Sequence, residues 1–170
     1  MKKLVLSFLL AIFAIGMNAQ VTMNVRAGGG MNTDDWGLTG LFQVNIPFSH
    51  ASNFTFSPSI QANISLPPDR AEFLGSQNIL LPLDIGYKIP IGLNSVFFPK
   101  IGPAIGYDIA SHSGFNIGPS VELTFEIKHF VFAVNGYYSI PEGTRRYERG
   151  GNDSSEGNVW NASLTFGYKF

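Results

Sequence analysis

The sequence contains no cysteine, and it is poor in charge. The missing cysteine excludes disulfide scaffolds, thiol catalysis and cysteine-based metal sites. Charged residues make up 14% of the chain, against roughly 25% in typical soluble domains. The formal net charge is only -1. Because phosphate backbones require a concentrated basic surface, a nucleic-acid partner is not expected.

Long hydrophobic runs are also scarce. Residues 4–17 form an apolar run behind Lys2 and Lys3, but this run is shorter than the roughly 20 residues that a membrane-spanning helix requires. A basic start, a short apolar stretch and a small residue at Ala19 are typical of a secretory signal peptide. A membrane anchor is the competing interpretation. We therefore expect a signal peptide over residues 1–19 and a single domain over residues 20–170.

After Gln20 the sequence alternates with a period of two, which indicates strands. One face of each run is apolar and uncharged, whereas the other is rich in Gly, Ser, Thr and Asn. The eight runs cover residues 21–29, 36–48, 54–66, 79–89, 97–109, 115–127, 130–140 and 160–170. Short turns are expected near 49–53, 90–95 and 128–129, and longer loops at 67–76 and 141–157. The pattern predicts an all-β fold, an eight-stranded antiparallel up-and-down barrel.

The two faces differ in volume, and this decides which one lies inside. A soluble lipocalin-like barrel would show the same alternation around an apolar ligand cavity. The interior of an eight-stranded barrel is only wide enough for side chains, so the face crowded with Phe, Leu and Ile belongs outside. Trp36 and Trp160 fall at loop-side strand ends, and Tyr87 and Tyr168 at turn-side ends, as in the aromatic girdles of membrane barrels. The sequence therefore predicts a transmembrane β-barrel.

Five prolines inside these runs count against the assignment, because each removes a ladder hydrogen bond that lipid cannot replace. They are Pro58, Pro82, Pro99, Pro103 and Pro119. Bulges are one way to absorb them. The repeated Ile-Gly-Pro at 101–103 and 117–119 predicts a shared local distortion in two neighbouring strands.

The end of the chain carries the most specific motif. Phe170 is the last residue, and Tyr168, Phe166 and Leu164 precede it at alternate positions. This motif resembles the terminal-strand signal that the barrel assembly machinery of bacterial outer membranes recognises. With the eight runs, it makes the chain similar to small outer-membrane β-barrel proteins of the OmpA/OmpX-like type, particularly the porin-like or PorT-like family of Bacteroidota. The resemblance covers nearly all of the mature chain. It implies the outer membrane of a Gram-negative bacterium, with lipid and lipopolysaccharide as partners, but no reaction.

Eight charged residues point into the barrel by the same alternation. Buried charges must be paired, so the first hypothesis is a network of ion pairs that fills the lumen. The alternative is a connected polar path. The eight residues are Arg26, Asp84, Lys88, Lys100, Asp108, Glu122, Glu126 and Lys169.

One set of residues is a candidate for catalysis. His112 and Ser113 lie in an expected loop, with Glu122 in the following strand, and a Ser-His-acid set activates a hydroxyl for acyl transfer. Two known kinds of small outer-membrane barrel modify lipid A. The deacylase pattern resembles His-x-Ser-Asn on a strand, whereas this chain has Ser-His-Ser-Gly at 111–114. A surface histidine between serines is the simpler interpretation. The three histidines are scattered, so we expect neither a metal site nor a cofactor.

The loop at 141–157 contains Arg145, Arg146 and Arg149. The guanidinium group of arginine can bind phosphate through two hydrogen bonds. The phosphates of lipopolysaccharide lie at the membrane interface on the loop side. Acidic residues nearly balance the charge of this loop, so a solvated loop is the alternative. We expect a non-enzymatic barrel with a structural or surface-interaction role through its outer loops, towards a ligand that the sequence does not identify. The alternatives are a lipid A-modifying acyl hydrolase or transferase and a narrow solute conduit.

Overall fold

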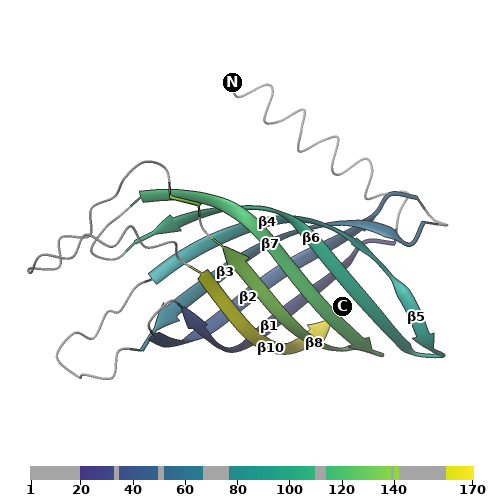
Figure 1. Ribbon diagram of the computed structural model, residues 1–170. Coiled ribbons are helices and arrows are strands. Elements are labelled where there is room, and N and C mark those ends of the chain that lie inside the picture. Colours follow the sequence, from purple (N-terminus) through teal and green to yellow (C-terminus); the bar gives the residue numbers. More distant parts are fainter. Residues whose placement is uncertain are drawn as a thin grey trace, which may run out of the picture.

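The computed structural model describes residues 20–32, 35–49, 52–66, 77–109, 114–138, 140–141 and 160–170, and these residues are almost entirely strands (Figure 1). The expected signal peptide lies outside the described residues. The strands are β1 (Thr22–Asn32), β2 (Asp35–Pro47), β3 (Phe54–Ser65), β4 (Gln77–Tyr87), β5 (Ile89–Gly92), β6 (Ser95–Asp108), β7 (Gly114–Ile127), β8 (Phe130–Tyr138), β9 (Ile140–Pro141) and β10 (Trp160–Lys169).

These strands form a closed barrel. The short β5 follows β4 after Lys88, and β9 follows β8, so the wall consists of eight segments. Neighbouring strands are antiparallel, and the pairing of β6 with β7 closes the ring in the order β6-β4-β3-β2-β1-β10-β8-β7. The prediction of an eight-stranded antiparallel barrel is confirmed. In the part of the chain that the structure describes, no helix is both long and apolar enough to cross a membrane.

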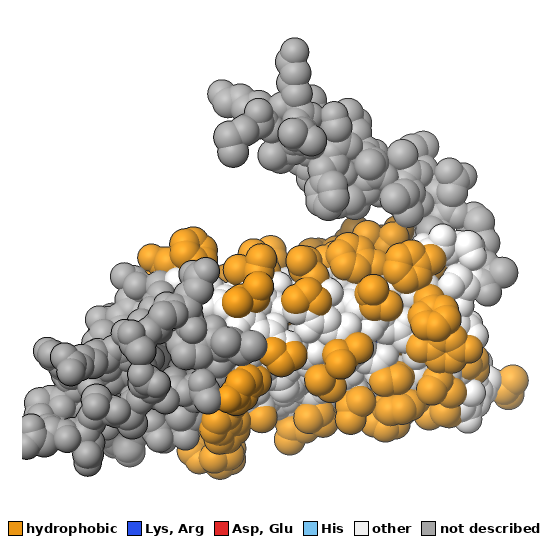
Figure 2. Space-filling view, turned by 45° about the horizontal axis from the view of Figure 1, so that its top comes forward, with side chains coloured by type: hydrophobic (Ala, Val, Ile, Leu, Met, Phe, Trp, Pro, Cys, Tyr) orange, Lys and Arg blue, Asp and Glu red, His pale blue; other side chains and the backbone are white. Residues whose placement is uncertain are grey.

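Side chains alternate between the outside and the inside of the barrel. In β10, exposed and buried residues alternate from Trp160 to Thr165. The outside carries large apolar side chains, such as Leu164 at 67% and Ile101 at 63% exposed, whereas most buried side chains are polar. Figure 2 shows hydrophobic side chains across the visible wall and no charged ones among its coloured residues. The choice of the bulky face as the exterior is confirmed.

At the seam between β1 and β10, the neighbouring backbone lies closest to two inward glycines, Gly28 and Gly167. A Cβ atom on Gly28 would lie 1.8 Å from the carbonyl oxygen of Leu164, and one on Gly167 would lie 1.9 Å from that of Val25. The two backbones approach so closely that a larger residue does not fit without moving them. Glycine thus lets the first and last long strands pair, which leaves neither of them as an open edge.

The five prolines lie within β3, β4, β6 and β7, and the described ladders of these strands contain no bulge at them. The register is the same on both sides of each proline. Pro103 faces Pro119 directly in an unbroken β6–β7 ladder, whereas the β4–β6 ladder is interrupted between Pro82 and Ile85. We infer that the nitrogen of Pro103 lies on the β4 side, where its missing donor interrupts the ladder. The prolines therefore remove residue pairs from the ladders but do not shift the register.

One turn is shorter than expected. The turn predicted at 90–95 is confined to Leu93 and Asn94, because Ile89–Gly92 form β5 and pair with the start of β6. The register shifts between Pro90 and Gly92, the only such shift in the described ladders. The sequence misses this strand because Pro and Gly normally indicate a turn.

Candidate functional site: a buried charge cluster in the lumen

The inward faces of β1, β6 and β7 bring three charged side chains together inside the barrel. Lys100 and Glu122 are direct partners in the β6–β7 register, so one strand pair supplies both members of an ion pair. Lys100 Nζ donates to Glu122 Oε1, and Arg26 Nη2 donates to Glu122 Oε2 over 2.7 Å. All three residues are at most 3% exposed. One carboxylate therefore binds two buried cations.

Neutral side chains extend this cluster to the opposite wall. Gln43 of β2 accepts a hydrogen bond from Lys100 Nζ at 2.7 Å, and its own Nε2 lies 3.4 Å from Glu122 Oε1. The Thr124 hydroxyl donates to Glu122 Oε1 at 2.7 Å. In the ring order, three strands separate β2 from β7 in either direction, so Gln43 and Glu122 come from opposite walls. These side chains together bridge the lumen. We call them the central cluster: Arg26, Gln43, Lys100, Glu122 and Thr124.

Asp84 on β4 has a different kind of partner. Ser120 Oγ donates to Asp84 Oδ1 and lies 3.0 Å from Gly102 O. Both side chains are buried. A hydroxyl, not a cation, is thus the hydrogen-bond donor that binds this carboxylate in the described part of the lumen.

Towards the turn side, the ammonium groups of two lysines lie over one aromatic ring. Phe98 is fully buried, with Lys100 Nζ 4.3 Å and Lys88 Nζ 5.4 Å from its ring centroid, within the range of cation–π attraction. Glu126, two residues further along β7 than Thr124, forms an ion pair of 2.5 Å with Lys169. Lys88 lies between β4 and β5.

Towards the loop side, the lumen contains neutral polar side chains. Thr39 Oγ1 donates to Asn63 Oδ1 at 2.8 Å, and Asn63 Nδ2 donates to Asn78 Oδ1 at 2.6 Å. The Tyr137 hydroxyl donates to Asn116 Oδ1 at 2.7 Å. Side chains therefore occupy the lumen at several successive heights, as expected for an eight-stranded barrel.

Because the central cluster is buried, its ion pairs contribute to the stability of the barrel. Removing one member of a buried ion pair costs about 3–5 kcal/mol, because it leaves an uncompensated charge. Within the described residues, Arg26 Nε and Nη1 have no hydrogen-bond partner, so the cluster has unused donors that a buried water would satisfy. The cluster therefore ties β1, β2, β6 and β7 together and places side chains across the middle of the lumen.

The structure brings together some of the charged residues expected in the lumen and not others. Arg26, Asp84, Lys100, Glu122 and Glu126 are buried inside, and Lys88 and Lys169 are half-buried towards the turn side. Asp108 ends β6, but its side chain lies outside the described part. Sequence reasoning misses Gln43 as a member of the cluster. Alternation places Gln43 on the inward face, yet a neutral amide among Ser, Thr and Asn gives no signal of its own.

The candidates in the loops lie outside the described residues. These are His112, Ser113, Arg145, Arg146 and Arg149. Glu122, the acid of the hydrolytic hypothesis, is described, and its carboxylate binds Arg26 and Lys100. It lies eight residues from Gly114, where β7 begins, which is about 26 Å of strand. This placement argues against Glu122 as the acid for a loop at that end. Among the described residues, no three His, Asp or Glu form a metal-binding group.

The terminal motif lies on the outside of β10, beside the seam. Leu164, Phe166, Tyr168 and Phe170 are 67%, 48%, 43% and 72% exposed. Phe170 N donates to Met23 O at 2.8 Å, so the motif ends against the start of β1. The outward placement of all four side chains leaves them available for contact with lipid or with another protein.

The chain resembles known proteins in fold and not in sequence. No protein-family model matches it, and no curated protein matches its sequence. Neisserial surface protein A superposes with a TM-score of 0.62 at 9% identity, over 88% of this chain and 95% of that one. The outer membrane enzyme PagL superposes with a TM-score of 0.59 at 13% identity, over 86% of this chain and 98% of that one. The chain thus has the closed eight-stranded antiparallel barrel fold of small outer-membrane proteins.

Proposed function

We propose that the chain is a non-enzymatic outer-membrane β-barrel protein with a structural or surface-interaction role, exercised through the loops at one end. The observation that carries this proposal is the distribution of side chains, apolar outside and polar inside. In a soluble barrel, water would have to solvate a wall of exposed Phe, Leu, Ile and Val. In a bilayer the same wall faces acyl chains, and a closed barrel leaves no open sheet edge in lipid.

Further features support the outer membrane as the location. Residues 1–19 have the pattern of a cleaved signal peptide. Met23 and Phe170 lie together at the turn side, the end that faces the periplasm in bacterial outer-membrane barrels. Membership of the porin-like or PorT-like barrels of Bacteroidota belongs to the same proposal, as does recognition of β10 by the barrel assembly machinery.

The loops at the other end then face outward, and we propose lipopolysaccharide as a partner there. The guanidinium group of an arginine can bind a phosphate through two parallel hydrogen bonds. The loop sequence contains three such residues, Arg145, Arg146 and Arg149. Retention of lipopolysaccharide by the purified barrel tests this contact. Changing all three arginines to Gln should lower retention, whereas changing them to Lys should lower it less. Equal retention in all three proteins would refute the contact.

The central cluster disfavours a solute conduit, because side chains from opposite walls meet across the lumen. A lipid A-modifying acyl hydrolase or transferase is the other alternative. The fold likeness to PagL at 13% identity carries no activity to this chain, and Glu122 is bound by two cations. No cofactor enters the proposed role.

Two measurements on the same cells test the proposal. After fractionation, we expect the protein in the outer membrane, with faster migration on a gel unless it is boiled. Mass spectra of lipid A with and without the protein should show the same acyl pattern. Recovery in the soluble fraction would refute the location, and a changed acyl pattern would refute the non-enzymatic role.

A further inference from the structure

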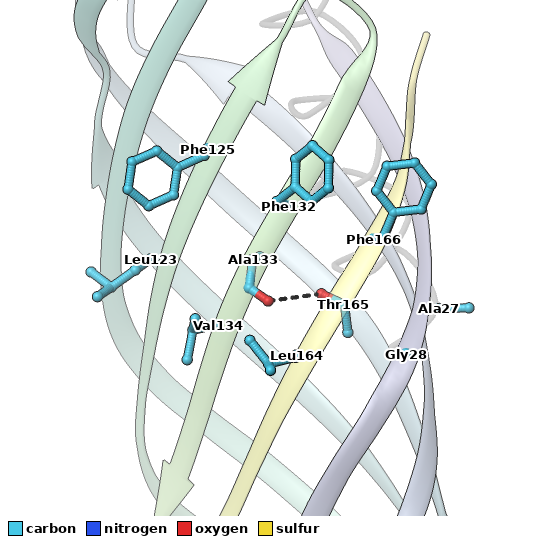
Figure 3. A pocket seen from close by; sticks show the side chains of 10 residues that line it. All are labelled: Ala27, Gly28, Leu123, Phe125, Phe132, Ala133, Val134, Leu164, Thr165 and Phe166. Carbon is cyan, nitrogen blue, oxygen red and sulfur yellow. Dashed lines mark hydrogen bonds between the residues drawn. The ribbon is translucent and has the colours of Figure 1, made fainter.

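An apolar groove of about 350 Å³ crosses the outer wall over β7, β8, β10 and β1 (Figure 3). Two rows of outward side chains form its sides, as the register places them. One row contains Phe125, Phe132 and Phe166, and the other contains Leu123, Val134 and Leu164. Ala27 of β1 pairs with Phe166 at the end of the phenyl row. A larger side chain at Ala27 would therefore fill this end of the groove.

Ring contacts lead from this groove to the turn-side rim. The Phe132 and Phe166 centroids are 4.8 Å apart, and those of Phe166 and Phe130 are 5.9 Å apart. Phe130 contacts Tyr168 at 6.2 Å, and the His129 ring stacks on Tyr168 at 5.4 Å. These rings form a continuous path on the outside of the barrel. The path ends at the hairpin between β7 and β8.

The hairpin at the end of this path is basic. Lys128 and His129 are both exposed. Among the described residues of the rim, Glu126 carries the only side-chain carboxylate, and it is buried and paired with Lys169. In the described part of the rim, Lys128 forms no ion pair, and no exposed side-chain carboxylate offsets its charge. An apolar groove thus leads to a basic end.

We propose that this surface binds one anionic phospholipid of the leaflet at the turn side. Its phosphate lies beside Lys128 and His129, and one acyl chain follows the rings into the groove. The inference rests on the proposed membrane location. Apolar contact alone selects no lipid in a bilayer, because the surrounding acyl chains are equally apolar. The charge of Lys128 supplies the preference for an anionic headgroup.

Native mass spectrometry of the folded barrel tests this site. The probes are phosphatidylglycerol and phosphatidylethanolamine with identical acyl chains, added in equal amounts to the detergent-solubilised protein. We expect phosphatidylglycerol to be retained about fivefold over phosphatidylethanolamine, which corresponds to the attraction of one lysine. Lys128→Asn should abolish this preference, and Lys128→Arg should keep it. Asn suits the variant because Lys128 has a φ of 55°, a conformation that Asn tolerates.

A second pair of variants tests the groove. Ala27→Phe should reduce retention of both lipids several-fold, whereas Ala62→Phe, outward on β3 and not part of the groove, should leave retention unchanged. Equal retention in these two variants, or no preference for phosphatidylglycerol in the unaltered protein, would overturn the inference. A dimer that Ala27→Phe abolishes would also overturn it, because the groove would then hold a second copy. Failure of the unaltered barrel to insert into lipid vesicles would instead refute the proposed function.

Discussion

Lys100 and Glu122 are direct cross-strand partners in the β6–β7 ladder, and their side chains form an ion pair inside the barrel. Arg26 binds the same carboxylate from β1. The interaction therefore joins two neighbouring strands and also reaches across the lumen. This double role makes Glu122 the residue on which the central cluster depends most.

Glu122→Gln should destabilise the barrel by about 3–5 kcal/mol, because Arg26 and Lys100 then lose their shared counter-charge. Urea unfolding of the barrel, refolded in detergent or vesicles, measures the change. The variant in which Arg26, Lys100 and Glu122 are all changed to Met removes every charge of the cluster and should be more stable than Glu122→Gln. Equal stability of Glu122→Gln and the unaltered protein would show that the ion pairs do not stabilise the barrel.

Gly28→Ala should weaken the seam between β1 and β10. Its new Cβ atom would lie 1.8 Å from Leu164 O, and forced overpacking of this kind costs on the order of 1–3 kcal/mol. Gly40→Ala is the matched control, because a Cβ atom there meets nothing within 4 Å. The same unfolding assay compares the two variants. If Gly28→Ala and Gly40→Ala change the free energy of unfolding equally, the backbones of β1 and β10 do not approach each other this closely.

Val121→Arg should cost about 2–4 kcal/mol if this outward residue lies near the middle of the membrane. Ile127→Arg, outward at the turn-side end of the same strand, should cost only about 0–1 kcal/mol, because it lies near the interface. The two residues are similarly exposed, at 45% and 48%, so depth is the main difference. Folding into vesicles measures both. Equal costs would contradict the depth profile of a membrane-spanning wall.

The barrel should carry no steady current in planar bilayers, because the central cluster crosses its lumen. Changing Arg26 and Glu122 together to Gly removes two of the bridging side chains and should produce measurable openings. Changing the neighbouring outward residues Val25 and Val121 to Gly is the control, and it should produce no openings. A steady current through the unaltered barrel would show that the lumen is open.

Alternation predicts the direction of a side chain because that direction is a local property of a strand. It therefore places Arg26, Lys100 and Glu122 on inward faces correctly. The meeting of Arg26 with Glu122 is not predictable in this way, because it depends on the register and closure of all eight segments. The pairing of Pro103 with Pro119 likewise requires the β6–β7 register, although their Ile-Gly-Pro repeats indicate a shared feature.

The candidate site is harder to predict from the sequence than the fold. The roles of Gln43 and Ser120 are visible only in the folded barrel. There Lys100 donates to Gln43, and Ser120 donates to Asp84. The groove and its basic end also depend on register, because it aligns Phe132 with Phe166. His112 and the three loop arginines remain predictions, since they lie outside the described residues.

The central claim is that the apolar face of the barrel contacts lipid, and the absence of cysteine allows it to be tested by single spin labels. Labels at Val121→Cys and Leu123→Cys point outward, and a label at Asn94→Cys in a turn serves as the water-exposed control. In vesicles, electron paramagnetic resonance should show that the two outward labels collide with dissolved oxygen, and not with a water-soluble nickel chelate. Collisions with the chelate as frequent as those at position 94 would show that this face contacts water, and would contradict the account.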